Sequence, residues 1–427
     1  MKQRGNNYVT SINMWTPRNA APGHRLMKNR EIRAPSSYKA GRRGVLYNLI
    51  FVPLRYRPPR PIQPAHYKKK PNRMTLHYQY LLPRTAGTPA RQLDDLCAQL
   101  QPLCSGGRAP VAARLYFSDL LNQAPAYMAH ALRRTLEAGF VSLIEQPPLH
   151  PGCKMALLIA TAPAGTFTAG GTPTCRLIRD DDGITHLYQT ERLTPDEARP
   201  LSAAEQTELL FARHISRLRE LGLNLRDHCH RTWIYVRDID RHYAGAVTGR
   251  NRVFAREGLT ADTHFIASTG IGGEGPCAEA AVCMDFYAAS AHTGIRYLKA
   301  PDYLNPTAEY GVAFERGTLL CLPHERHAYI SGTASIDRHG QILYPTDVGR
   351  QTDRLFLNIS QLLAEAGMTL HDAAYLTVYL RDVADYADTA RYMAAHFPHT
   401  PYLITLARVC RPGWLIEVEC HARQAAG

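Results

Sequence analysis

The C-terminal stretch Tyr402–His421 constrains the fold of this chain more than any other segment. Two apolar runs flank residues 411–414, where Pro and Gly occupy the two central positions of a turn. This pattern predicts a β-hairpin. Because side chains alternate between the faces of a strand, one face of the hairpin should carry Arg408, Cys410, Glu417 and Glu419.

The polar face of this expected hairpin has two explanations. It could be an exposed face with a cross-strand pair between Arg408 and Glu417, which would stabilise the sheet by about 1 kcal/mol or less. It could also be the wall of an active site, since two glutamates, an arginine and a thiol are not what a simple core strand needs. The pattern alone leaves both explanations open.

The charge of the chain is concentrated at its N-terminus. Residues 1–73 hold 17 of the 50 Lys and Arg residues and one of the 37 acidic residues, so this segment has a net charge of +16. The remaining chain has 33 basic and 36 acidic residues, a net charge of −3. The overall charge of +13 therefore says little about what the folded part binds.

Three interpretations of residues 1–73 compete. The segment could be a disordered arm for nucleic acid or a membrane surface, an Arg-rich targeting peptide, or a leader upstream of the natural start. We favour the leader, because composition changes abruptly at Met74. Ten Cys without a pairing pattern, and no apolar run near ~20 residues, predict a soluble protein in a reducing compartment, the cytoplasm. Because the excess of basic charge belongs to the N-terminal segment, we expect the folded part to bind neither nucleic acid nor a membrane.

From Met74 onward the pattern predicts an α+β protein. Expected helices are 89–100, 122–138 and 203–221, and expected strands are 155–162, 231–237 and 280–288. In the strand 231–237, Arg231, Trp233 and Tyr235 share a face that suits an anion-binding wall better than a core.

Three motifs are poor evidence for a cofactor. Asp180-Asp181-Asp182 lacks the downstream Glu of a calcium loop. His228-Cys229-His230 has no CxxC partner, and adjacent residues of a strand point to opposite faces. The GxGxxG at 270–275 is followed by Pro276 and an expected strand, whereas a dinucleotide fingerprint must open a helix. We expect neither a metal nor a dinucleotide.

The C-terminal part forms a compact module. The irregular segment 299–316 offers Tyr303, Tyr310 and Arg316 as ligand contacts. After it, the pattern predicts strand 327–336, helix 348–367, strand 374–380, helix 386–396 and the hairpin. This β-α-β-α-β-β order indicates a sheet with helices on one side.

This module resembles the RidA/YjgF family, which has a chorismate-mutase-like fold. The resemblance runs from Ile330-Ser331-Gly332-Thr333 through LLAEAGMTLHDAAYLTVYLRDVADY to IEVECHA. It implies trimeric relatives, sites between subunits and a functional glutamate in the last strand. Deaminase members carry an arginine just after the proline that precedes the penultimate strand. Here Pro401-Tyr402-Leu403 replaces it, so that carboxylate anchor is missing.

A longer part of the chain, from about Met74 to the end, resembles the chorismatases. The matching segments are 231–235, Gly249-Arg250-Asn251, 267–271, Tyr310-Gly311 with Phe314 and Arg316, and Cys410 seven residues before Glu417. The family converts chorismate to pyruvate and a cyclic product without a metal or redox cofactor. We therefore expect a leader at 1–73, an N-terminal chorismatase domain at 74–300 and a RidA/YjgF-like domain at 301–427.

The resemblance also implies a mechanism and a site. Glu417 matches the acid that protonates the enolpyruvyl group, and Glu419 could raise its pKa further. Cys410 matches the cysteine of the members that form 3-hydroxybenzoate. Expected substrate-binding residues are Arg231, Tyr303, Tyr310, Arg316, Gly332 and Arg408.

The expected activity is conversion of chorismate to 3-hydroxybenzoate and pyruvate, with 4-hydroxybenzoate as a possible second product. The alternatives are a chorismate hydrolase that yields a dihydroxy-dihydrobenzoate, and a RidA-like ligand-binding protein without turnover. The resemblance implies a monomer or a homotrimer.

Overall fold

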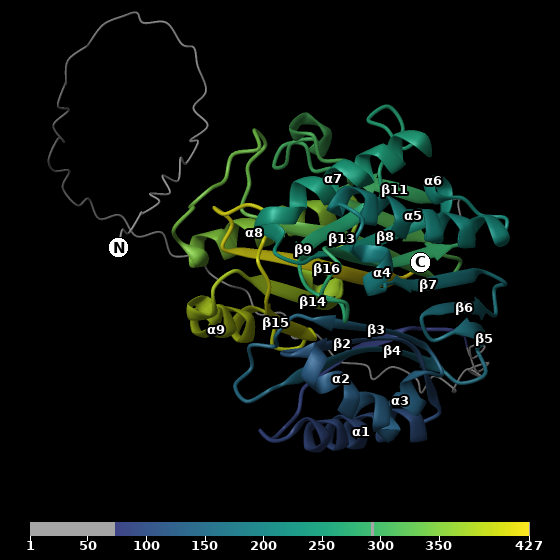
Figure 1. Cartoon of the computed structure of the whole chain (residues 1–427). Coiled ribbons are helices and arrows are strands. Elements are labelled where there is room, and N and C mark those ends of the chain that lie inside the picture. Colours follow the sequence, from purple (N-terminus) through teal and green to yellow (C-terminus); the bar gives the residue numbers. More distant parts are fainter. Residues whose placement is uncertain (1–72, 292–293, 427) are drawn as a thin grey trace, which may run out of the picture. The chain divides into compact units, whose positions relative to one another are not determined.

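Three β-sheets organise the chain after residue 73, and helices pack on their outer faces (Figure 1). The structure is a computed structural model that describes residues 73–291 and 294–426, with the side chain of Tyr310 excepted. The basic segment 1–73 lies outside the described residues except for Arg73. All described residues fall within one compact unit.

The first sheet has the strand order β1-β4-β2-β3. Its strands are β1 (His77–Leu81), β2 (Arg108–Phe117), β3 (Phe140–Glu145) and β4 (Met155–Pro163). Its helices are α1 (Pro89–Ser105), α2 (Leu120–Ala129) and α3 (Ala131–Leu136).

The single helix predicted at 122–138 is wrong, because the chain breaks at His130. The backbone of His130 is extended, and its Nδ1 accepts a hydrogen bond from the N–H of Leu132 at 3.0 Å. His130 thus caps a new helix instead of continuing the first.

The second sheet has the order β5-β6-β7-β10-β8-β9. Its strands are β5 (Phe167–Thr172), β6 (Cys175–Asp180), β7 (Thr185–Glu191), β8 (Cys229–Val236), β9 (Ala267–Gly272) and β10 (Val282–Ala289). Its helices are α4 (Pro195–Ala198), α5 (Ala203–Glu220), α6 (Leu225–His228) and α7 (Ile239–Arg256). A Cβ on Gly249 would lie 2.3 Å from the carbonyl oxygen of Ala204, so this glycine lets α7 pack directly on α5.

The third sheet has the order β11-β12-β13-β16-β14-β15. Its strands are β11 (Ile295–Leu298), β12 (Gly317–Cys321), β13 (Glu325–Ala334), β14 (Ala373–Leu380), β15 (Tyr402–Leu406) and β16 (Ile416–Ala425). Its helices are α8 (Val348–Glu365), α9 (Tyr386–His396) and the short turns η1 (Thr307–Tyr310), η2 (Leu370–Asp372) and η3 (Val383–Asp385). Strand β11 belongs to the third sheet although it precedes residue 301. The domain boundary expected at residue 301 stays a prediction.

The predicted terminal hairpin is wrong. Strand β14 lies between β15 and β16, parallel to the first and antiparallel to the second. The connection 407–415 therefore crosses over the end of β14, and Arg408 does not face Glu417. A parallel β14–β15 pair joined through α9 is a common crossover, and the periodicity of a strand does not identify its neighbours.

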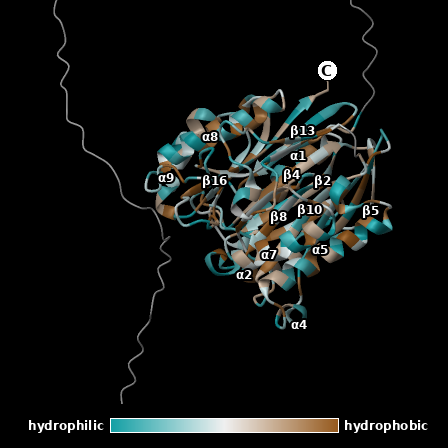
Figure 2. Ribbon diagram, turned by 90° about the horizontal axis from the view of Figure 1, so that it is seen from above, coloured by the Kyte–Doolittle hydropathy of each residue, from teal (hydrophilic) through white to brown (hydrophobic). Residues whose placement is uncertain are grey.

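The second and third sheets have the same order of strands along the chain, and the first sheet matches their last four strands. The α+β class is thus confirmed. One apolar core joins residues of all three sheets. Helix α8 buries Leu355, Ile359 and Leu362 against the third sheet, and its hydrophilic residues lie on the outside (Figure 2).

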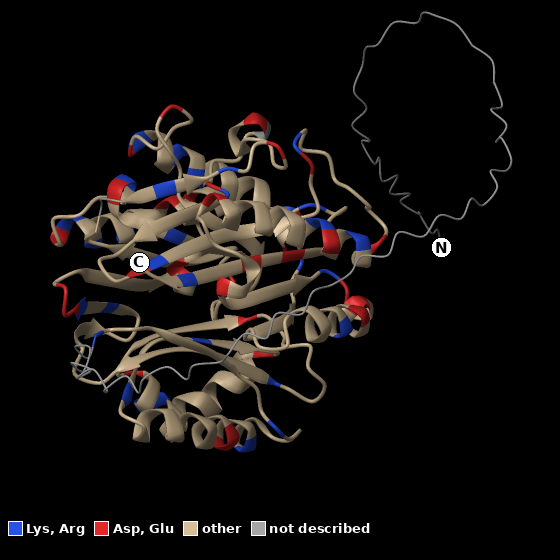
Figure 3. Ribbon diagram, turned by 180° about the vertical axis from the view of Figure 1, so that it is seen from behind, with Lys and Arg blue, Asp and Glu red and all other residues tan. Residues whose placement is uncertain are grey.

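Charged residues lie mostly on helices and loops, with a few on the central strands (Figure 3). In the part of the chain that the structure describes, no helix combines the length and the apolar character needed to cross a membrane.

Candidate active site

A cavity lies where β9 and α7 of the second sheet face β13, β16 and the connection 407–415 of the third. Its walls contain acidic, basic, thiol and aromatic side chains from both sheets. They comprise Tyr243, Arg250, Ser268, Gly270, Val312, Phe314, Arg316, Gly332, Ala334, Ile336, Cys410, Arg411, Trp414 and Glu417.

Glu417 supplies the carboxyl group of this cavity. It pairs with Ala334 of β13 and Tyr379 of β14, and it is 4% exposed. A Cβ on Gly332 would lie 2.0 Å from its Oε1, so glycine there makes room for the carboxyl group. Burial, followed by the charge of Glu419, raises the pKa of Glu417 to about 8. The group therefore carries a proton at neutral pH.

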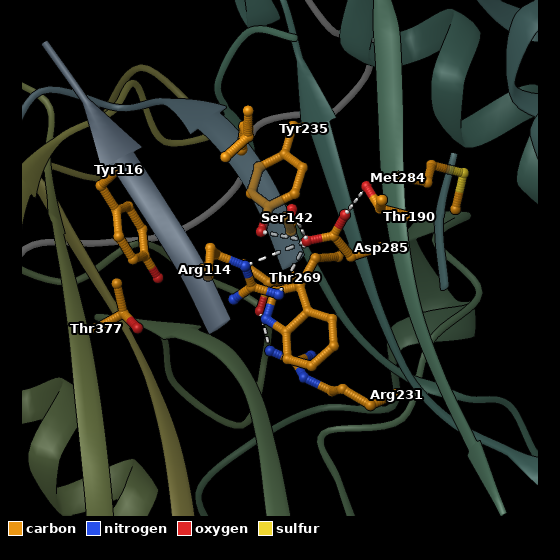
Figure 4. Close-up of polar contacts among 12 residues, drawn as sticks. Arg114, Tyr116, Ser142, Thr190, Arg231, Tyr235, Thr269, Met284, Asp285 and Thr377 are labelled. Atoms are coloured by element: carbon orange, nitrogen blue, oxygen red, sulfur yellow. Dashed lines mark hydrogen bonds and ion pairs between the residues drawn. The ribbon is translucent and has the colours of Figure 1, made fainter. Parts of the chain in front are cut away.

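Glu419 lies two residues further along the same face of β16 and accepts hydrogen bonds from three other strands. Thr377 of β14 donates to Oε1 at 3.0 Å. Oε2 accepts from Arg231 at 2.7 Å, Trp233 at 2.9 Å and Thr269 at 2.9 Å. Three of these donors, Arg231, Thr269 and Thr377, are shown in Figure 4. This set of donors suits an ionised carboxylate, and its charge disfavours ionisation of Glu417.

Arg231 does not line the cavity but lies behind it. Its side chain is 3% exposed, and it is held by Glu419 and by the hydroxyl of Thr269. The predicted anion-binding wall of β8 therefore faces a buried carboxylate of the protein itself.

Two arginines enter the cavity from different sheets. Arg250 of α7 is 2% exposed, and its guanidinium lies 6.0 Å from the ring centre of Phe254. Arg316 precedes β12, is 6% exposed, and donates to the backbone and side-chain oxygens of Asn305 at 3.0 and 3.1 Å. Two guanidinium groups beside a protonated acid can bind a ligand with two carboxylates.

Cys410 lies in the connection 407–415 and is half-buried. Burial and the nearby charge of Glu417 raise the pKa of its thiol to about 12, while the interaction with Tyr243 acts in the opposite direction. The thiol is therefore neutral near pH 7. It can contact a substrate but is not an activated nucleophile.

A second buried carboxylate repeats the arrangement of Glu419 in the second sheet. Asp285 of β10 accepts from Ser142 and Thr190, each at 2.7 Å (Figure 4), and from Tyr235 at 3.4 Å. It also pairs with Arg114 and Arg192, each at 3.1 Å. These partners come from the first and second sheets. A buried charge with five partners ties the sheets together, and Asp285 itself borders a cavity with Arg114 and Trp233.

The structure separates the remaining residues predicted for the site. Gly332 and Arg316 line the cavity with Glu417 and Cys410. The Arg408 side chain is 60% exposed and pairs with Asp240 at 3.2 Å in a different cleft.

Tyr303 lies outside the cavity wall, where its carbonyl accepts from Arg354 at 3.1 Å. Tyr310 ends η1, but its side chain lies outside the described residues.

Four cavity residues were not expected from the sequence: Tyr243, Arg250, Phe314 and Trp414. The sequence does indicate that Tyr243 and Arg250 lie together, because residues seven positions apart share a helix face and both belong to α7. No local pattern could show that this face meets strand β16, more than 150 residues further along the chain.

None of the described side chains forms a cluster of three or more His, Cys, Asp or Glu that could hold a metal ion. Asp180 instead interacts with His186 at 3.2 Å, and His230 interacts with the carbonyl of Ala291 at 3.2 Å. Gly270 and Gly272 lie in strand β9, so the GxGxxG does not open a helix.

Residues 317–424 match the family called endoribonuclease L-PSP. The 3-aminoacrylate deaminase RutC of Acinetobacter baylyi is 30% identical over 93 residues, which are 21% of this chain and 73% of RutC. A RutC family protein of Pyrococcus abyssi is 30% identical over 126 residues, which are 29% of this chain and 91% of that protein.

The crystal structure of a chorismatase has a similar fold. It superimposes with a TM-score of 0.59 at 17% sequence identity, and the match covers 82% of this chain and 99% of the chorismatase chain. The shared fold thus extends well beyond the C-terminal domain. Through that domain, with its matching curated relatives, the chain belongs to the endoribonuclease L-PSP family of RidA/YjgF-like proteins.

Proposed function

We propose that this protein is a chorismatase that converts chorismate to 3-hydroxybenzoate and pyruvate. The observation that carries the proposal is Glu417, a buried carboxyl group protonated near pH 7, in a cavity with two arginines. The enolpyruvyl group of chorismate needs a proton on its methylene carbon. A carboxylic acid with a raised pKa can donate it at neutral pH.

The two arginines from different sheets suit the two carboxylates of chorismate. Arg316 is oriented by Asn305, and Arg250 lies on the α7 side of the cavity. Binding both carboxylates would fix the substrate across the cavity and place the methylene carbon against Glu417. In this proposal Arg250 takes the role that the sequence suggested for Arg231 and Arg408.

Proton transfer from Glu417 makes the enolpyruvyl carbon an oxocarbenium-like centre. In hydrolysis, water attacks this carbon, and the resulting hemiketal breaks its bond to the ring oxygen to give pyruvate and a dihydroxy-dihydrobenzoate. In the other route, the neighbouring ring hydroxyl attacks the ring carbon that bears the ether, expels pyruvate with the ether oxygen and returns its proton to Glu417. The epoxide that forms then opens with uptake of a proton, and loss of a ring C–H proton gives 3-hydroxybenzoate. Formation of 3-hydroxybenzoate consumes no water, because chorismate contains all atoms of the two products, whereas hydrolysis consumes one. The apolar walls Val312, Phe314, Ile336 and Trp414 favour the route to 3-hydroxybenzoate because they limit water.

Cys410 is the residue that we propose to select the product. It lies on the wall next to Glu417, and its neutral thiol can contact a ring carbon without competing as an acid. Cys410→Ala should still release pyruvate, at a lower rate, with a smaller fraction of 3-hydroxybenzoate. An unchanged product distribution would show that Cys410 only fills space.

The experiment that tests the function is incubation of the purified protein with chorismate, followed by chromatographic analysis of pyruvate and aromatic products. Glu417→Gln should lose pyruvate release by about 10²–10⁴-fold and retain its fold. Release of pyruvate at the wild-type rate would remove Glu417 from the mechanism. If the wild type binds chorismate without turnover, the protein is a ligand-binding member of its family.

A further inference from the structure

Tyr243 lines the candidate active site from the first turns of α7. Arg250, seven residues later, lines the same cavity, because positions seven apart lie on one helix face. The helix therefore contributes one phenol and one guanidinium to the same wall. Arg250 has a role in the proposed binding of carboxylates, and Tyr243 has none so far.

The backbone of β9 brings Tyr243 and Cys410 together. A Cβ on Gly270 would lie 3.0 Å from Cε2 of Tyr243, so the ring packs directly on this glycine. The next residue, Ile271, forms an antiparallel bridge with Val409. The connection that carries Cys410 is thus fixed to the same strand, one residue away from the glycine under the ring.

The Tyr243 hydroxyl and the Cys410 thiol line the same cavity and interact, since each group affects the pKa of the other. Burial raises the pKa of both groups, that of the thiol to about 12, so both keep their protons near pH 7. The pair is neutral. Tyr243 therefore does not activate Cys410 as a nucleophile, and the property it can control is the direction of the thiol.

The direction of the thiol matters because Cys410 lies close to the acid. The charge of Glu417 contributes to the raised pKa of both Cys410 and Tyr243. A thiol held toward Tyr243 occupies a defined part of the wall. A thiol free to rotate about χ1 would open space beside the substrate ring that water could enter.

We propose that Tyr243 is a positioning residue that fixes the orientation of the Cys410 thiol and thereby sets the ratio of 3-hydroxybenzoate to the other products. This inference rests on the proposed chorismatase function. It assigns product choice to a pair of residues from two sheets and not to the cysteine alone.

The test is Tyr243→Phe, which removes one oxygen and keeps the ring on Gly270. Products are compared at equal chorismate conversion, so that a change in rate does not enter the ratio. The ratio of 3-hydroxybenzoate to hydrated diene should fall about 3- to 10-fold, the effect of one lost polar contact, in the same direction as in Cys410→Ala. The double variant should match Cys410→Ala, because Tyr243 acts only through the thiol.

Tyr127→Phe is the matched control. Tyr127 is buried in α2, and its hydroxyl has no hydrogen-bond partner among the described residues. The same chemical change there should leave the product ratio unaltered.

A wild-type ratio in Tyr243→Phe, or an additive shift in the double variant, overturns the inference while the chorismatase activity stands. A second measurement needs no substrate. The infrared S–H stretching band that disappears in Cys410→Ala should move in Tyr243→Phe, and an unmoved band overturns the proposed contact. A wild type that releases no pyruvate overturns the proposed function, and the inference about products with it.

Discussion

Replacement of Glu417 by Gln should stabilise the protein at alkaline pH, and this test needs no substrate. The folded state holds the proton of Glu417 up to a pKa of about 8, compared with 4.5 for an ordinary glutamate. A group whose pKa is raised on folding contributes stability below its unfolded pKa, and that contribution is lost as the pH rises toward the folded pKa. Glutamine resembles the protonated acid and cannot ionise.

The expected size follows from the two pKa values. Each unit corresponds to about 1.4 kcal/mol of differential interaction. Between pH 5 and pH 8, the free energy of unfolding of the wild type should therefore fall by about 3–4 kcal/mol relative to that of Glu417→Gln. At pH 5 the two proteins should differ by less than about 1 kcal/mol, because the folded protein still holds the proton and this pH lies only slightly above the pKa of the unfolded glutamate.

The assay is denaturant or thermal unfolding of both proteins at matched ionic strength from pH 5 to pH 8.5. Other titrating groups are common to both proteins, so the difference between them isolates Glu417. Asp262→Asn, an exposed carboxylate, is the control and should change stability by less than about 0.5 kcal/mol. A difference between wild type and Glu417→Gln that stays constant with pH would refute the buried, protonated acid.

Four further outcomes are expected. Gly332→Ala should lower chorismate turnover at least ~10²-fold, because its Cβ would displace the Glu417 carboxyl group. The same change at Gly349, in helix α8, should instead raise thermal stability by about 0.5–1 kcal/mol. Glu419→Gln should shift the alkaline limb of the pH–rate profile to lower pH, since its charge helps to keep Glu417 protonated; an unmoved limb contradicts this. Arg250→Gln should raise KM for chorismate about 10- to 100-fold with a smaller change in kcat, as kinetics would show. Deletion of residues 1–73 should leave activity and Tm unchanged, and a truncated protein that fails to fold would show that the segment packs on the rest.

Local patterns of the sequence were sufficient for most elements of the third sheet. The strand at β13, the stripe of α8 and the alternation of β16 each depend on neighbouring residues along the chain. Alternation also placed Glu417 and Glu419 correctly on one face of a strand. The partner of that strand was wrong, because a strong turn signal at 412–413 does not show that β14 lies between the two flanking strands.

The composition of the candidate site could be predicted only in part, for a related reason. Glu417, Cys410, Gly332 and Arg316 all belong to the C-terminal part, where the family resemblance is most specific. Arg250 comes from a helix of another sheet, and the sequence does not show which sheets face each other. The function of Arg231 could not be read from its residue type, since a buried arginine can bind a substrate or a carboxylate of the protein.

The repeated strand order allows equivalent positions of the three sheets to be compared, and only one of the three positions carries the candidate acid. Tyr379, Tyr235 and Tyr116 occupy the same position in the three sheets, and their partners across the ladder are Glu417, Cys283 and Ala156. Only the first of these partners can donate a proton at neutral pH, because burial raises the pKa of the Cys283 thiol to about 11 and alanine has no proton to give.

Two residues further along, the same ladders place Glu419 opposite Thr377, Asp285 opposite Trp233, and Leu158 opposite Arg114. The carboxylate that holds two sheets together is thus present twice, whereas the protonated cavity acid is present once. A buried carboxylate held by several donors can serve structure alone, as Asp285 does between Arg114 and Arg192. Glu417 instead keeps its proton in a cavity that Arg250 and Arg316 also line, which that structural role does not explain. The asymmetry among three similar positions is therefore itself an argument that Glu417 is retained for chemistry.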